Sequence, residues 1–205
     1  MTYHHGDLRR ALVDAALALV EETQRWDFSL REVACRAGVS HNAPYAHFQD
    51  KGALLAAVGV RVYESLRAAT TAAAAGCRTA EEELLAIGKA YIMFGLRHVA
   101  YYRLMSGQAL AVDGRLPEPV REAAEAARAV LREIIIYGLQ DGSFDVDPDD
   151  EDGIAAAVVS AWSLVHGFTL LAIDGLAARE TELEPDRLID MTLRQFVKGL
   201  ARKDA

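Results

Sequence analysis

The chain has 205 residues, 52% of them hydrophobic, with five prolines and two cysteines; this allows an ordered core in one or two small domains and excludes a disulfide scaffold. The formal net charge of −8 lies mainly beyond residue 51, because residues 1–51 carry six Lys/Arg and seven Asp/Glu. Since even this segment is not a basic patch, only modest non-specific affinity for DNA is expected.

The N-terminal segment lacks a basic region followed by an apolar core, so no signal peptide is predicted and a cytoplasmic protein is expected. Asp7 can cap a first helix that runs from Leu8 to about Thr23. One side of this helix is apolar at helical spacing, with Leu8, Leu12, Ala15, Ala16, Leu19 and Val20.

Two short helices joined by a tight turn are predicted next. Ser29 and Glu32 form a capping box, so a helix should begin at Leu30, and Gly38 should end it. Ser40 can cap a second helix over 41–47. A helix, a glycine-containing turn and a second helix make a helix-turn-helix, whose second helix can enter the major groove of DNA.

Further helix signals follow along the chain. Asp50 can cap a long helix that Gly76 ends, and Thr79 with Glu82 offers a second capping box. The helices expected beyond the motif cover 53–75, 80–98, 101–110, 119–139, 154–173 and the segment after Pro185. With no strand pattern and no repeat, the predicted fold class is all-α, with about nine helices.

The stretch Ile154–Ile173 has no Asp, Glu, Lys or Arg over 20 residues, which is the length of a membrane span. Both of its flanks are acidic, and Ser160, Ser163 and His166 dilute its apolar character. We therefore favour a helix that is buried on both sides. One face would line the domain interior and the other a subunit interface.

The order and spacing of the motif resemble those of a known family. The run Leu30-Arg31-Glu32-Val33-Ala34 is followed by Ala37-Gly38-Val39-Ser40, by Tyr45-Ala46-His47-Phe48, and then by Lys51 and Leu54-Leu55. This pattern resembles the DNA-binding signature of TetR-type transcriptional regulators. The resemblance implies an N-terminal three-helix DNA-binding domain over 1–51 and a C-terminal helical ligand-binding and dimerisation domain over 52–205. Arg25-Trp26 departs from the family, which often has glycine just after the first helix.

Under this resemblance, the exposed side of the second helix reads DNA. Residues 40–42 lie at its N-terminus, where Asn42 could pair with adenine and His41 could donate to guanine. Tyr45 and Lys51 match family positions that mostly contact phosphate. The predicted DNA-binding residues are Tyr3, Ser29, Ser40, His41, Asn42, Pro44, Tyr45, His47 and Lys51. For each of them, the alternative is an ordinary exposed surface residue.

Trp162 followed by His166-Gly167 resembles the Trp-His-Gly signature of one class of TetR-type C-terminal effector domains. Small-molecule sites combine aromatic walls with a few polar tips. The candidate ligand-binding residues of this kind are Tyr91, Phe94, Tyr101, Tyr102, Met105, Trp162 and His166, for which plain core packing is the alternative. No nucleophile–base pair, phosphate-cradling glycine loop or metal-binding motif is present, so no enzyme, metal site or cofactor is predicted.

These features predict a ligand-responsive repressor that a small apolar ligand releases from a pseudo-palindromic, double-stranded DNA operator. No membrane partner is expected. The protein would act as a homodimer whose interface is formed by the Ile154–Ile173 helix and the C-terminal helix. The alternative is a helical small-molecule binding protein that has lost DNA recognition. The neutral N-terminal segment keeps this alternative open, as does Ala46, which stands where relatives often have a basic residue. An all-α enzyme is the third reading.

Overall fold

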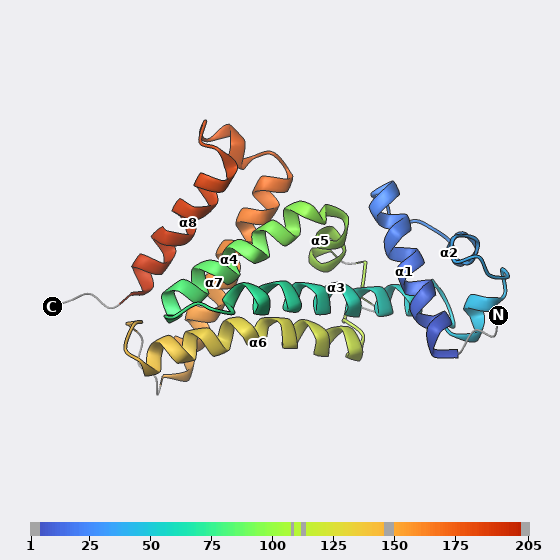
Figure 1. Cartoon of the computed structure of the whole chain (residues 1–205), viewed down its shortest axis with the longest axis horizontal. Coiled ribbons are helices and arrows are strands. Elements are labelled where there is room, and N and C mark those ends of the chain that lie inside the picture. Colours follow the sequence, from blue (N-terminus) through green and yellow to red (C-terminus); the bar gives the residue numbers. More distant parts are fainter. Residues whose placement is uncertain (1–4, 108, 112–113, 146–149, 202–205) are drawn as a thin grey trace. The chain divides into compact units, whose positions relative to one another are not determined.

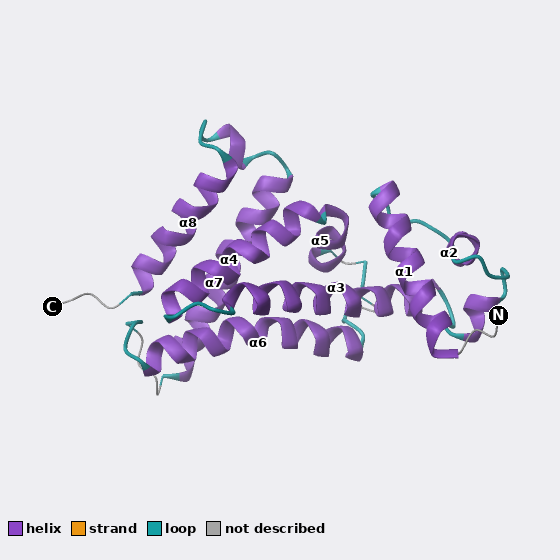
Figure 2. Ribbon diagram, viewed as in Figure 1, coloured by secondary structure: helices purple, strands orange, loops and turns teal. Residues whose placement is uncertain are grey.

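A computed structural model describes residues 5–107, 109–111, 114–145 and 150–201. The secondary structure of this part of the chain is helical, without a strand, which confirms the predicted all-α fold class (Figures 1 and 2). Against the nine or so helices expected, these residues form eight α-helices and two 3-10 helices. Their bounds are α1 (His5–Thr23), α2 (Leu30–Arg36), η1 (Ala43–Ala46), α3 (Lys51–Ala74), α4 (Ala80–Arg97), α5 (Val99–Ser106), α6 (Glu118–Gln140), α7 (Glu151–Ile173), η2 (Ala177–Arg179) and α8 (Pro185–Leu200).

Most helix ends fall at the signals that predicted them. At the start of α3, Asp50 Oδ1 accepts a hydrogen bond of 2.8 Å from the Ala53 N–H, and beyond its end Gly76 has φ +92°. Helix α1 is an exception, because it begins at His5 rather than Leu8. Asp7 therefore lies within the first turn of α1 and not at its N-cap.

The contacts divide the chain into two compact units. The first unit comprises residues 1–64 and 98–124, and the second comprises residues 65–97 and 125–205. Helices α1, α2, η1 and α5 thus belong to the first unit, and α4, α7, η2 and α8 belong to the second. The predicted functional boundary after residue 51 stays a prediction.

The core of the first unit joins α1 to the helix-turn-helix segment. Helices α1 and α2 pack against each other, and so do α2 and η1. The apolar side of α1 faces inward as expected, since Leu12, Ala16 and Val20 are all fully buried. Other buried members of this unit are Leu30, Val33, Ala34, Phe48, Leu54, Val58 and Val62. The apolar spacing along α1 therefore predicted the centre of its buried side, whereas Leu8 and Leu19 are half-buried.

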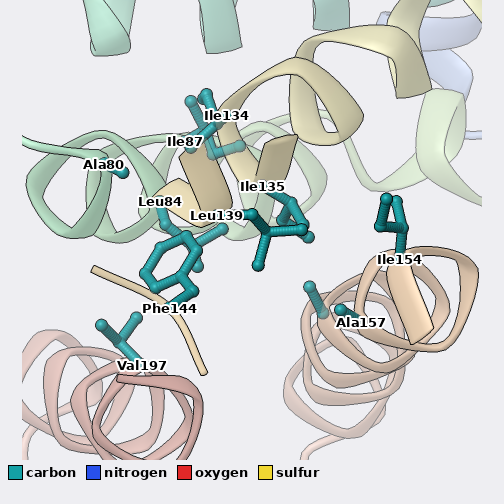
Figure 3. Packing of buried hydrophobic residues seen from close by; sticks show 11 residues of the cluster. Ala80, Leu84, Ile87, Ile134, Ile135, Leu139, Phe144, Ile154, Ala157 and Val197 are labelled. Carbon is teal, nitrogen blue, oxygen red and sulfur yellow. The ribbon is translucent and has the colours of Figure 1, made fainter. Parts of the chain in front are cut away.

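A second core joins α4, α6, α7 and α8 in the second unit (Figure 3). Its buried members include Leu84, Ile135, Leu139, Ile154 and Val197, together with Phe144 from the turn after α6. At Gly138 an added Cβ would lie 2.3 Å from the Phe144 ring and 2.9 Å from the Ala80 Cβ. This glycine is therefore needed for the Phe144 ring to lie directly against α6.

Helix α7 is capped by Asp150, whose Oδ1 accepts a bond of 3.0 Å from the Gly153 N–H. Among the described residues it is the one helix long and apolar enough to span a membrane by composition, and 28% of the relevant window is buried. The buried side carries Ile154, Ala157, Ala161, Val165 and Thr169, whereas Val159, Trp162 and Leu171 are exposed. A single chain therefore covers one side of α7 but not both.

Candidate nucleic-acid interface

The start of α2 is built by the predicted capping box. Ser29 has extended backbone angles, its Oγ accepts a bond of 3.2 Å from the Glu32 N–H, and its own N–H donates to Glu32 Oε2 at 2.6 Å. The bond from the Ser29 N–H stabilises the carboxylate and holds the pKa of Glu32 below its usual range. Two backbone donors at the helix start are satisfied in this way, which fixes where α2 begins.

The turn after α2 is a Schellman motif centred on Gly38. Gly38 has φ +69°, its N–H donates to the Cys35 carbonyl at 3.1 Å, and the Val39 N–H donates to the Ala34 carbonyl at 3.0 Å. Only glycine adopts this left-handed conformation without a steric penalty. The turn therefore ends α2 sharply and leads the chain directly into the segment predicted to meet DNA.

The second helix of the motif is shorter than predicted and is a 3-10 helix. It spans Ala43–Ala46, and its N-cap is Asn42 without a side-chain capping bond, so the predicted cap at Ser40 is wrong. Pro44 explains the difference, because it has no N–H and disfavours the α conformation at the residue before it. The turn is closed instead by short-range bonds such as that from the His47 N–H to the Pro44 carbonyl, at 2.9 Å.

The side chains predicted to contact DNA differ in exposure. Ser40, His41 and Asn42 are exposed, as is Tyr45, at 53%. His47 is half-buried and Pro44 is buried. Tyr3 lies outside the described residues. The residues from 40 to 45 with exposed side chains therefore form one short polar and aromatic surface that follows the Schellman turn.

Lys51, at the first residue of α3, is held by its own chain. Its Nζ donates to the Trp26 carbonyl at 2.6 Å and lies 4.9 Å from the centroid of the Phe28 ring. The Trp26 indole Nε1–H in turn donates to the Ala100 carbonyl on α5, at 2.9 Å. Sequence reasoning did not predict these contacts of Trp26. The one signal that could have indicated them is Arg25-Trp26, which stands where TetR-type regulators often have glycine after the first helix.

Arg9 is a cation of this region that the motif did not identify. Its guanidinium lies 5.2 Å from the centroid of the Phe48 ring, directly after His47 in the sequence. A second cation, Arg36, donates from Nη1 to Glu22 Oε2 at 2.5 Å and so joins α2 to α1. Arg9 lies on α1, before the motif, and Arg36 is the last residue of α2, at a position that the motif's spacing does not specify.

The residues predicted to bind a ligand fall into two groups. Tyr101, Tyr102 and Met105 lie on α5 in the first unit, and the first two are buried. Tyr91, Phe94, Trp162 and His166 lie in the second unit, on α4 and α7. The sequence pattern that combined them could not show that they belong to different compact units, and their role in ligand binding stays a prediction.

In the second unit, three of the predicted residues form a polar aromatic cluster. Tyr91 Oη and His166 Nδ1 are 3.2 Å apart, and the rings of His166 and Trp162 are 5.8 Å apart. Arg128 on α6 lies 5.6 Å above the Trp162 ring. Burial lowers the pKa of His166, so its imidazole is neutral at pH 7. This cluster can offer an aromatic face, a hydroxyl and an imidazole to a ligand.

Two family models match this chain. Residues 12–58 match the one described as bacterial regulatory proteins, tetR family, and residues 84–196 match the one described as tetracyclin repressor-like, C-terminal domain. The first match contains the capping box, the Schellman turn and η1. The second contains the Tyr91–Trp162–His166 cluster. No curated protein matches the sequence.

Solved structures share the fold over nearly the whole chain. A protein of unknown function from Rhodococcus sp. RHA1 is 30% identical, with a TM-score of 0.84, and the match covers 98% of this chain and 100% of that one. A TetR family transcription regulator from Marinobacter aquaeolei VT8 is 17% identical, with a TM-score of 0.69 and coverage of 95% and 96%. The regulator FadR from Bacillus subtilis, in complex with stearoyl-CoA, is 15% identical, with a TM-score of 0.70 and coverage of 93% and 98%.

Proposed function

We propose that this chain, which belongs to the TetR family and is thus a DNA-binding transcriptional regulator, is a repressor. A small, largely apolar ligand would release it from its operator. The operator would be pseudo-palindromic, because a symmetric dimer presents the same reading surface twice. The observation that carries this proposal is the set of exposed side chains directly after a Schellman turn, those of Ser40, His41, Asn42 and Tyr45.

The residues of this surface suit a division of roles. Asn42 can make a bidentate contact with adenine, and His41 can donate to the acceptors of guanine. Tyr45, His47 and Lys51 suit contacts with phosphate, which set the position of the motif but not its sequence preference. With only −1 net charge in residues 1–51, the protein would depend on these specific contacts more than on bulk attraction.

The exposed side of α7 supports a homodimer through α7 and α8. Val159, Trp162 and Leu171 on α7 are exposed large apolar residues, and so is Met191 on α8. Apolar side chains gathered on one element and facing water favour a protein interface. A second copy of the same helix pair would cover them and would supply the second reading surface that the operator requires.

Ligand release would follow from a difference in affinity between two states of the protein. The Tyr91–Trp162–His166 cluster supplies aromatic and polar groups for an effector. One structural neighbour, FadR, holds stearoyl-CoA, so a fold of this kind can accommodate a ligand with an apolar tail. Such a ligand lowers operator affinity only if it binds the state with misaligned motifs more tightly.

The test is binding of the protein to fluorescent duplexes from upstream of its own gene, followed by anisotropy at about 50 mM and 200 mM salt. We expect specific binding that weakens at the higher salt, because phosphate contacts release counterions. Absence of binding to every upstream duplex at low salt would contradict the proposal.

A second function, that of a helical ligand-binding protein without DNA recognition, is favoured by one observation. Ala46 is exposed within η1 and offers no charge to phosphate, in a segment of net charge −1. Such a protein would bind an apolar fluorescent probe but no duplex. A selection from a random duplex library separates the two functions, because only the regulator enriches a common sequence.

A further inference from the structure

Two consecutive hydrogen bonds join α5 to the first residue of α3. The Ala100 carbonyl on α5 accepts the indole N–H of Trp26 at 2.9 Å. The backbone carbonyl of Trp26 accepts the ammonium of Lys51 at 2.6 Å. All of these residues belong to the same compact unit. Trp26 therefore takes part in two polar contacts at once, one through its side chain and one through its backbone.

Aromatic packing holds Trp26 in this position. Its ring lies 6.2 Å from that of Phe28 and 6.3 Å from that of Tyr101, at tilted angles of 51° and 54°. These are separations at which aromatic pairs attract. Tyr101 is itself held on α1, where its hydroxyl donates to the Leu17 carbonyl at 3.2 Å. The loop after α1 is thus attached to α5 by both packing and a hydrogen bond.

Lys51 is oriented by the same group of residues. Its ammonium has three donors, of which the bond to Trp26 takes one, and the Phe28 ring stabilises the charge from 4.9 Å. A lysine side chain that is ordered in advance loses less entropy when it binds a phosphate. The position of the Trp26 carbonyl therefore affects how well Lys51 can serve as a phosphate contact.

We propose that Trp26 is a positioning residue for DNA binding: its bond to Ala100 fixes the carbonyl that orients Lys51, so that a displacement of α5 reaches the lysine. This rests on the proposed function, in which Lys51 contacts phosphate. Trp26 itself touches no DNA and acts only through Lys51. A purely structural role would have a different result, since Trp26 would then affect stability without affecting the contribution of Lys51.

A double-mutant cycle tests the proposal. The probe is the duplex that the wild-type chain enriches most from a random-sequence library. The variants are Trp26→Phe, which keeps an aromatic ring but removes the indole N–H, Lys51→Met, which keeps the stem but removes the charge, and the double variant. Tyr137→Phe is the control, because it removes one polar group from an exposed aromatic residue of α6, in the other unit and outside the proposed interface.

We expect Lys51→Met to weaken binding and to lower the slope of log affinity against log salt by about one, because one phosphate contact is lost. Trp26→Phe should weaken binding about 2- to 10-fold, the effect of one net hydrogen bond, with the salt slope unchanged. The double variant should bind no more weakly than Lys51→Met, since Trp26 acts only through the lysine. Tyr137→Phe should bind as the wild type does.

Wild-type affinity of Trp26→Phe, or losses that simply multiply in the double variant, would overturn the role of Trp26 while leaving the regulator intact. If the wild type enriches no duplex, DNA recognition fails, and the role of Trp26 fails with it. These two failures are therefore distinguishable.

A fluorescence measurement covers the case in which Trp26→Phe does not fold. In the Trp162→Phe chain, Trp26 is the single tryptophan and reports on its own surroundings. Its emission should change when Lys51→Met is added and when the duplex is bound. The response to the duplex should be smaller without the lysine. Emission that responds neither to the substitution nor to the duplex would overturn the proposal.

Discussion

At the scale of single residues, Ser29 and Ser40 differ in their role at a helix start, although both are exposed. Ser29 caps α2 through a bond of 3.2 Å to the Glu32 N–H, whereas η1 has no side-chain capping bond. We expect Ser29→Ala to lower the free energy of unfolding by about 0.5–2 kcal/mol, because a helix donor loses its partner. Ser40→Ala is the control and should have little effect. Urea unfolding of both variants checks this, and equal losses would contradict it.

Glu32 gives a prediction for the dependence of stability on pH. Its pKa in the folded chain lies below the ordinary value of 4.5, chiefly through the bond from the Ser29 N–H. A lowered folded pKa means that the stabilisation is complete above the unfolded pKa and is lost as pH falls through the folded pKa. Glu32→Gln should therefore be less stable than the wild type at pH 7, and the difference should shrink as pH falls below about 4. Thermal melts of the wild type and of Glu32→Gln at pH 7 and below about pH 4 test this direction, and a stability difference that grows at the lower pH would contradict it.

Asn42 and Tyr45 should affect DNA binding in different ways. Both are exposed, but only Asn42 has the paired donor and acceptor that adenine matches. We expect Asn42→Ala to cost about 1–3 kcal/mol on the preferred duplex and to relax the preference at one base pair. Tyr45→Ala should weaken binding to all duplexes alike. Affinities for a panel of single-base variants of the duplex distinguish the two, and a base-specific loss at Tyr45 would reverse the assignment.

At the scale of elements, local signals predicted α2 well and η1 poorly. The capping box and Gly38 are satisfied within a few residues of their own positions, so the sequence shows both ends of α2. Ser40 resembles an equally good cap, but Pro44 removes a donor of the following turn and shortens the helix to 3-10 geometry. The start of this helix depends on the competition between the Ser40 cap and Pro44, and the spacing of apolar residues gives no information on its outcome.

The close packing of α6 on Phe144 was not visible in the sequence and gives a second test at this scale. A Cβ at Gly138 would lie 2.3 Å from the Phe144 ring. Gly138→Ala should therefore lower the free energy of unfolding by about 1–3 kcal/mol through overpacking. In α8, a Cβ at Gly199 meets nothing within 4 Å. Gly199→Ala should be neutral or stabilising by up to about 1 kcal/mol, because helix propensity rises.

Denaturant titration of the two glycine variants gives the comparison. A loss at Gly199 as large as that at Gly138 would mean that backbone conformation, and not the Phe144 ring, controls the cost. The pair therefore separates packing from propensity within the same unit.

At the scale of the whole molecule, the sequence does not show which distant residues pack in the same compact unit. The aromatic residues predicted as one ligand site divide between two compact units, with Tyr101 on α5 and His166 on α7. Which helices share a core depends on tertiary packing, and a list of aromatic positions does not contain that information. The uncharged run Ile154–Ile173 predicts one face in the domain interior and the other in a subunit interface; within one chain Val159 and Leu171 are exposed, and burial of their side by a second copy stays a prediction.

That exposed side of α7 gives the prediction for assembly. Val159 is 54% exposed on α7, and Tyr137 is 44% exposed on α6, outside the proposed interface. A buried arginine in an apolar interface is costly because its charge loses water without gaining a partner. Val159→Arg should therefore sediment as a monomer at micromolar concentration, whereas Tyr137→Arg should remain a dimer. Because a monomer reads only one half-site, operator affinity of Val159→Arg should fall by about 100-fold or more. A Val159→Arg chain that remains dimeric and binds the operator normally would place the interface elsewhere.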